Sequence, residues 1–128
     1  MVVDTSALIA ILLGETDAAR FELAIAESSD PVISAVAMVE FGMVALSRRG
    51  FSPAEVERRL GDWGLSVLPV TGATARLALA AFTRYGRGRH EAALNFGDCF
   101  VYALAKKRGE PLLFKGDDFA RTDLVPAL

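Results

Sequence analysis

Three carboxylic acids in this sequence could do chemistry, because each lies alone in an apolar stretch. Asp4, Glu40 and Asp98 are each the only charged side chain in a run of apolar and small residues. These runs are residues 1–14, 31–47 and 92–105. An unpaired carboxylate is costly to bury, so each acid needs a cation, a set of hydrogen bonds or a raised pKa. The pattern favours one shared site where a single cation satisfies all three.

A simpler role exists for two of the three acids. Asp4 and Asp98 could each cap the helix that follows, although the hydroxyls of Thr5 and Ser6 are alternative caps for the first helix. Glu40 has no such explanation, because it falls in the middle of a predicted apolar helix. We therefore take Glu40 as the most informative of the three.

A cluster of carboxylates is suited to Mg²⁺ or Mn²⁺, which prefer hard oxygen ligands and keep several waters. Such an ion lowers the pKa of a bound water and polarises a phosphate, which supports phosphodiester hydrolysis. Zinc sites built on Cys and His are excluded by the presence of one Cys and one His. The sequence has no Walker-type glycine loop and no Gly-x-Ser-x-Gly elbow. Cys99 lies among apolar residues and is expected to be a buried hydrophobe rather than a nucleophile paired with His90.

Strand-like and helix-like segments alternate along the chain, which predicts an α/β fold with a central, mainly parallel β-sheet flanked by helices. The predicted strands are residues 1–3, 31–33, 65–70 and 111–114. The predicted helices are residues 5–13, 16–26, 35–49, 53–60, 73–85 and 99–107, with a short turn or helix at 118–121. In such sheets, sites lie beyond the carboxyl ends of the strands. Asp4 follows the first strand, and the pair Asp117 and Asp118 follows the last.

At 128 residues the chain is expected to be one domain, residues 1–128. Its hydrophobic content of 52% and mean hydropathy of +0.34 suggest that a partner covers some apolar surface. The net charge of −2 is unusual for a nucleic-acid binder, but Arg87 and Arg89 fall in a local basic stretch. We expect no signal peptide and no membrane span, and the single cysteine fits a cytoplasmic location.

Four segments resemble, in order, the motifs of PIN domains, specifically those of VapC toxins from bacterial toxin–antitoxin pairs. The segments are MVVDTSAL (1–8), SAVAMVE (34–40), LNFGDCFVYALA (94–105) and LLFKGDDF (112–119). The likeness covers nearly the whole chain, and the third segment is the most specific.

The resemblance implies a PIN-like fold and a metal-dependent endoribonuclease. Asp4 and Asp98 would be the principal metal ligands, Glu40 would complete the acidic pocket, and either Asp117 or Asp118 would be the fourth acid. Thr5 and Ser6 would order metal-bound water. The resemblance also implies a homodimer, a cognate VapB-type antitoxin that blocks the site, and RNA as the substrate, which Arg87 and Arg89 would help to bind.

Two other functions fit parts of the pattern. A catalytically inert PIN-like module that only binds RNA or protein would retain the fold without the activity. A receiver-like signalling domain is also a small α/β fold with a magnesium-binding acid pocket. It would need paired acids after the first strand, where Asp4 stands alone, and an acid after the strand predicted at 65–70.

Overall fold

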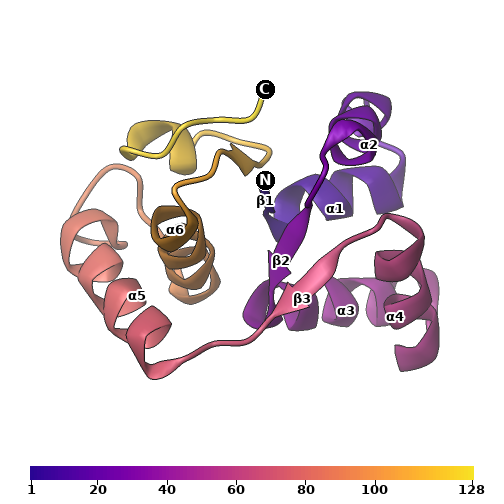
Figure 1. Ribbon diagram of the computed structural model, residues 1–128, viewed down its shortest axis with the longest axis horizontal. Coiled ribbons are helices and arrows are strands. Elements are labelled where there is room, and N and C mark those ends of the chain that lie inside the picture. Colours follow the sequence, from indigo (N-terminus) through magenta and orange to yellow (C-terminus); the bar gives the residue numbers. More distant parts are fainter.

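Four short parallel strands form the centre of the molecule in the computed structural model, which describes residues 1–128 (Figure 1). The strands are β1 (Val2–Val3), β2 (Val32–Ser34), β3 (Ser66–Leu68) and β4 (Leu112–Leu113). Their order in the sheet is β3-β2-β1-β4, and all three pairings are parallel. The predicted α/β fold with a mainly parallel sheet is confirmed.

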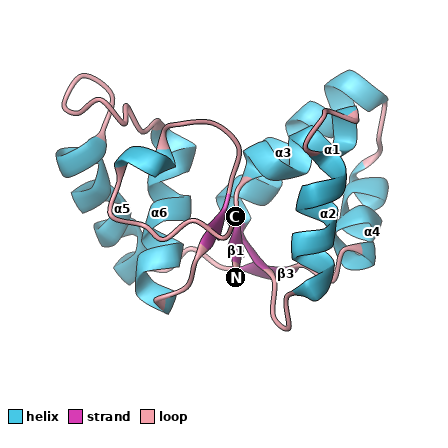
Figure 2. Cartoon of the chain, turned by 90° about the horizontal axis from the view of Figure 1, so that it is seen from above, coloured by secondary structure: helices cyan, strands magenta, loops and turns pink.

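Helices cover both faces of this sheet. They are α1 (Thr5–Leu13), α2 (Ala18–Glu27), α3 (Ala35–Arg49), α4 (Pro53–Asp62), α5 (Gly72–Tyr85) and α6 (Phe96–Arg108), with a 3-10 turn η1 at Phe119–Arg121. Seen from above, α5 and α6 lie on one side of the strands, and α1, α2 and α4 lie on the other (Figure 2). No helix is long and apolar enough to cross a membrane.

Several helix boundaries follow from local side-chain chemistry. Ser34 caps α3 by accepting a hydrogen bond from the Val36 N–H at 3.2 Å. Ser52 forms a capping box with Glu55 at the start of α4. α3 ends at Gly50, whose φ of +66° suits a residue without a Cβ atom. These limits agree with those predicted from the sequence.

Two helices begin more than one residue away from the predicted start, α2 at Ala18 instead of residue 16 and α6 three residues early, whereas α1 begins at Thr5 as predicted. The N-cap of α1 is Asp4 itself rather than Thr5 or Ser6, because the Asp4 carboxylate accepts the Ser6 N–H. α6 begins at Phe96 instead of Cys99, because Asn95 caps it and accepts the Asp98 N–H at 2.9 Å. The capping role that the sequence left open for Asp98 is therefore partly correct, since Asp98 is the third residue of a capping box.

The core lies around β1 and β4, whose valines and leucines are all buried. By contrast β3 is the exposed edge of the sheet, and its observed length is three residues, shorter than predicted. The outer edge of β4 is covered by the C-terminal segment, where the Ala127 N–H donates to the Leu112 carbonyl at 2.8 Å. The central strand and the last strand are thus fully enclosed, and both lead directly into candidate site residues.

Candidate active site

Asp4 lies at the junction of β1 and α1 and is only 5% exposed. Its backbone N–H donates to the Leu113 carbonyl of β4 at 2.9 Å, which fixes its position at the carboxyl edge of the sheet. Both the N–H and the hydroxyl of Ser6 donate to its Oδ2, at 2.9 and 2.5 Å. Burial raises the pKa of Asp4, and these Ser6 hydrogen bonds oppose the shift. The fold thus holds a carboxyl group where water cannot solvate it.

Asp98 is half-buried in the first turn of α6. Its Oδ2 accepts the backbone N–H of Asn95 at 2.9 Å. Desolvation raises the pKa of Asp98 to about 6 despite that hydrogen bond, and the negative charges of Asp4, Asp118 and Glu40 add to the increase. The charges of three other candidate acids, Asp4, Asp118 and Glu40, therefore all affect the protonation of Asp98.

Glu40 extends from the middle of α3 toward the start of α6. A Cβ atom placed on Gly97 would lie 1.6 Å from Glu40 Oε1, so the carboxylate rests against a glycine that has no side chain. Burial raises the pKa of Glu40, and so does the nearby charge of Asp4. Because Gly97 has no side chain, the Glu40 carboxylate can lie against the backbone of α6 directly before Asp98.

Asp117 and Asp118, the pair of acids after β4, are the two candidates for the fourth acid of the site. The side chains of both are exposed. The charge of Asp118 is among the causes that raise the pKa of both Asp4 and Asp98. These charge effects favour Asp118 as the fourth acid, and the choice between Asp117 and Asp118 stays a prediction.

The four acids are close enough to repel one another, but they are not a preformed ligand set. No three Asp, Glu, His or Cys side chains are arranged to hold one metal ion together. The convergence is thus looser than the sequence predicts. The physical reason is that Asp4 and Asp98 are each restrained by cap hydrogen bonds while their charges repel.

The donor set nevertheless fits a hard divalent cation. Mg²⁺ is commonly held by one or two carboxylates together with several waters, so Asp4 and Asp98 would suffice as protein ligands. The single hydrogen bond to the Asp98 carboxylate goes to Oδ2, which leaves Oδ1 for a ligand. A cation would also offset the mutual repulsion that raises these pKa values.

The hydroxyls of Thr5 and Ser6 already have protein partners. Thr5 is buried and donates to the Ala37 carbonyl at 3.1 Å. Ser6 donates to Asp4 and accepts the Lys115 N–H at 2.9 Å, and so links α1 to the segment after β4. Their predicted role in ordering metal-bound water stays a prediction.

Arg87 and Arg89 are exposed in the segment between α5 and α6. The guanidinium of Arg89 lies over the Phe82 ring, 5.5 Å from its centroid. This segment contacts the turn that carries Asp118, because Arg121 donates to the Glu91 carbonyl at 3.3 Å. RNA binding by the two arginines remains a prediction.

The pair of Cys99 and His90 does not form a nucleophile and base. Cys99 is buried, and desolvation raises the pKa of its thiol. His90 accepts the Ala92 N–H through Nδ1 and packs edge-on against Tyr85. The predicted structural role of Cys99 is consistent with both observations.

Comparison with known proteins places this arrangement in a family. The sequence matches the PIN domain family model over residues 1–125. The chain belongs to the PIN domain family. Among PIN-domain relatives, ribonuclease VapC30 of Mycobacterium tuberculosis is 44% identical over 126 residues, covering 98% of this chain and 96% of its own. Ribonuclease VapC of Mycolicibacterium smegmatis is 45% identical over 126 residues, covering 98% of both chains.

Solved PIN-domain structures share the fold. VapC20 of M. tuberculosis, described as a sarcin–ricin loop cleaving toxin, superposes with a TM-score of 0.74 at 21% identity, covering 97% of this chain and 95% of that one. A toxin–antitoxin complex from Klebsiella pneumoniae gives a TM-score of 0.73 at 19% identity, covering 99% and 97%. The receiver-like interpretation is therefore wrong, and the expected resemblance to VapC toxins is confirmed.

Two residues of this PIN-domain site were missed from the sequence. Gly97 gives no signal of its own, because its role depends on the approach of a distant helix. Asn95 could have been found, since Asn at one position and Asp three residues later is the spacing of a capping box.

Proposed function

We propose that this protein is a metal-dependent endoribonuclease that acts as the toxin of a VapBC-type toxin–antitoxin pair. The observation that carries the proposal is the gathering of Asp4, Glu40, Asp98 and Asp118 at one edge of the sheet, where burial and mutual repulsion raise the pKa of three of them. Relatives of about 45% identity are named VapC ribonucleases, which supports RNA as the substrate.

In the proposed reaction, Asp4 and Asp98 would hold Mg²⁺ or Mn²⁺. When bound, the ion supplies Lewis-acid activation of a water and of the scissile phosphate. Ser6 keeps the Asp4 carboxylate oriented, and the Asn95 N–H does the same for Asp98. Glu40 and Asp118 add negative charge beside these two carboxylates and so favour a cation at the site.

The proposed partners are a VapB-type antitoxin, RNA and a second copy of this chain, and the proposed location is the cytoplasm. The toxin–antitoxin complex from K. pneumoniae supports the antitoxin. The apolar side chains of α1 are mostly buried, whereas Val39 and Met43 of α3 are 58% and 64% exposed. The α3 side chains line a groove of about 380 Å³ between α3 and α4. We therefore place the dimer contact on α3.

The test is RNA cleavage by Asp4→Asn and Asp98→Asn variants. Each substitution preserves shape and removes a full charge, and hard cations bind carboxylate far better than amide. We expect cleavage to fall below detection while the fold, followed by circular dichroism, stays intact. Expression of the wild-type chain alone should arrest growth, and expression of either variant should not.

A matched control is Asp30→Asn, which removes a carboxylate from an exposed ion pair with Arg108. It should cleave RNA at the wild-type rate. Undiminished Mg²⁺-dependent cleavage by Asp98→Asn, with contaminating nuclease excluded, would refute this site. Binding of RNA without cleavage by the wild-type protein would instead support the inert PIN-like module.

A further inference from the structure

The placement of Asp118 depends on the chain on either side of it. Asp118 makes no capping hydrogen bond through its side chain, and it is exposed at the start of η1. On the N-terminal side, the Lys115 N–H is held by Ser6. Directly after Asp118, the Phe119 side chain is buried, and the centroid of its ring lies 5.5 Å from that of the Phe114 ring. The C-terminal side needs an equivalent anchor.

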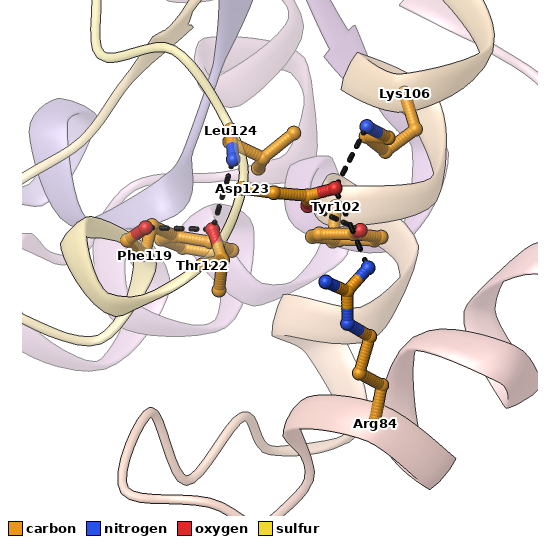
Figure 3. A network of polar contacts seen from close by, with 7 residues as sticks. All are labelled: Arg84, Tyr102, Lys106, Phe119, Thr122, Asp123 and Leu124. Carbon is orange, nitrogen blue, oxygen red and sulfur yellow. Dashed lines mark hydrogen bonds and ion pairs between the residues drawn. The ribbon is translucent and has the colours of Figure 1, made fainter.

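Asp123 is that anchor (Figure 3). The phenol of Tyr102 donates to its Oδ1 at 2.6 Å. Lys106 and Arg84 pair with its Oδ2 at 3.0 and 3.5 Å. Between this anchor and Phe119, the Thr122 hydroxyl donates to the Phe119 carbonyl at 2.7 Å, which closes the turn.

The residues that hold Asp123 share a helix face with a proposed metal ligand. Asp98, Tyr102 and Lys106 are spaced four residues apart on α6, so their side chains lie on one side of the helix. The segment after β4 meets this face twice. At the start of the helix, the charge of Asp118 contributes to the raised pKa of Asp98. One and two turns further along, Asp123 accepts hydrogen bonds from Tyr102 and Lys106.

The burial and the protonation states of Tyr102 and Asp123 favour a stable hydrogen bond between them. Tyr102 is only 7% exposed, so its hydroxyl would lose a buried partner if Asp123 moved away. Burial and the hydrogen bond to Asp123 raise the pKa of Tyr102, which keeps the phenol a donor. The same phenol and Lys106 lower the pKa of Asp123, which keeps the acceptor charged.

We infer that Asp123 is a positioning residue: through Tyr102 and Lys106 it holds the turn that sets Asp118 opposite Asp98. This inference rests on the proposed function, because it assigns Asp123 a role in assembling the same acid site. Neither Asp123 nor Tyr102 touches the substrate or the ion in this scheme. Both act only through Asp118.

The experiment is a double-mutant cycle read out by Mn²⁺ affinity of the metal-free protein, measured by calorimetry. The variants are Asp123→Ala, Asp118→Asn and the combination of both. If Asp123 acts through Asp118, each single variant should weaken Mn²⁺ binding by about tenfold or more, the usual effect of losing a partner that orients a metal ligand. The combination should bind as Asp118→Asn does, because coupled sites are not additive.

Tyr102→Phe serves as a second variant, since it keeps the ring and removes only the hydroxyl. It should reproduce part of the Asp123→Ala effect and lose that effect in the Asp118→Asn background. Asp30→Ala, which breaks an ion pair elsewhere, should leave Mn²⁺ affinity unchanged. Melting temperatures taken on the same samples identify any variant that weakens binding through loss of the fold.

Wild-type affinity in both Asp123→Ala and Tyr102→Phe would overturn the inference, as would losses that add fully to that of Asp118→Asn. Either result leaves the proposed function standing, provided that Asp98→Asn still abolishes cleavage. Absence of Mn²⁺ binding by the wild-type protein would overturn the proposed function and this inference together.

Discussion

At the scale of single residues, the site depends on one place where a side chain is missing. Gly97 lies in a helix, where alanine is normally the more stable residue. Here the space of its Cβ atom is taken by the Glu40 carboxylate. The lower helix propensity of glycine at this position is therefore accepted because only glycine leaves room for the Glu40 carboxylate from α3.

Gly97→Ala should for this reason lower the free energy of unfolding by about 1–3 kcal/mol, the usual cost of overpacking, and should reduce RNA cleavage at least tenfold. In a Glu40→Ala background the same substitution should cost no stability. Gly61→Ala in α4, where a Cβ meets no atom within 4 Å, is the matched control and should be neutral or stabilising. Equal melting temperatures for Gly97→Ala and wild type would contradict this account of Gly97.

The pKa of Asp98 gives a pH-dependent prediction for the metal-free protein. Its folded value of about 6 lies above the ordinary value of about 3.9, so folding favours the protonated form. That contribution to stability is complete below about pH 4 and is lost as the pH rises through about 6. The melting temperature of Asp98→Asn relative to wild type, in chelator, should therefore increase from pH 4 to pH 7.

The acids with lowered pKa values do not obscure this comparison. Glu55, Glu110 and Asp123 have lowered pKa values, so they stabilise the fold above their unfolded pKa and lose that effect in acid. The Asn variant retains all three, and their contribution cancels in the difference. A difference in melting temperature that does not vary with pH would mean that Asp98 titrates normally.

At the scale of elements, two helices begin with the same motif for different purposes. α4 starts with a capping box of Ser52 and Glu55, and α6 starts with one of Asn95 and Asp98. The box on α4 is exposed and includes none of the candidate site acids. The box on α6 also fixes a proposed metal ligand.

Asn95→Ala and Ser52→Ala should therefore each lower stability by about 1 kcal/mol, the usual cost of a lost cap. Only Asn95→Ala should also reduce RNA cleavage beyond what its stability loss explains, because it removes the amide oxygen that accepts the Asp98 N–H and so loosens the turn that carries the Asp98 carboxylate. Urea denaturation and cleavage rates on the two variants make the comparison. Equal activities would indicate that the α6 cap serves the fold alone.

The elements that the sequence predicted best are those with local signals. Ser34, Ser52 and Gly50 mark helix ends by chemistry within a few residues, and both predicted limits of α3 and the predicted start of α4 agree with the structure. The isolation of the acids in apolar runs likewise identified Asp4, Glu40 and Asp98. The contact of Tyr102 with Asp123 could not be predicted, because it depends on the path of an irregular segment across α6.

At the scale of the whole molecule, apolar surface remains uncovered. Val39 and Met43 on α3 are exposed, and a second apolar groove of about 340 Å³ lies between α5 and α6. We expect a homodimer through α3, so Met43→Glu should yield a monomer by light scattering. Leu23→Glu, at a similarly exposed position on α2, should remain dimeric. A wild-type monomer at micromolar concentration would contradict the dimer.

The order of the strands has a consequence for how the protein is made. β1, from the first residues of the chain, lies between β2 and β4, and β4 comes from near the C-terminus. A ribosome delivers the N-terminus first, so Asp4 is exposed to the cell long before Asp118 exists. Pairing of such distant segments is a late step in folding. The nascent chain therefore has an incomplete acid cluster until Asp118 has been made and β4 has paired with β1, so we expect no RNA cleavage by a chain that has not yet reached this point.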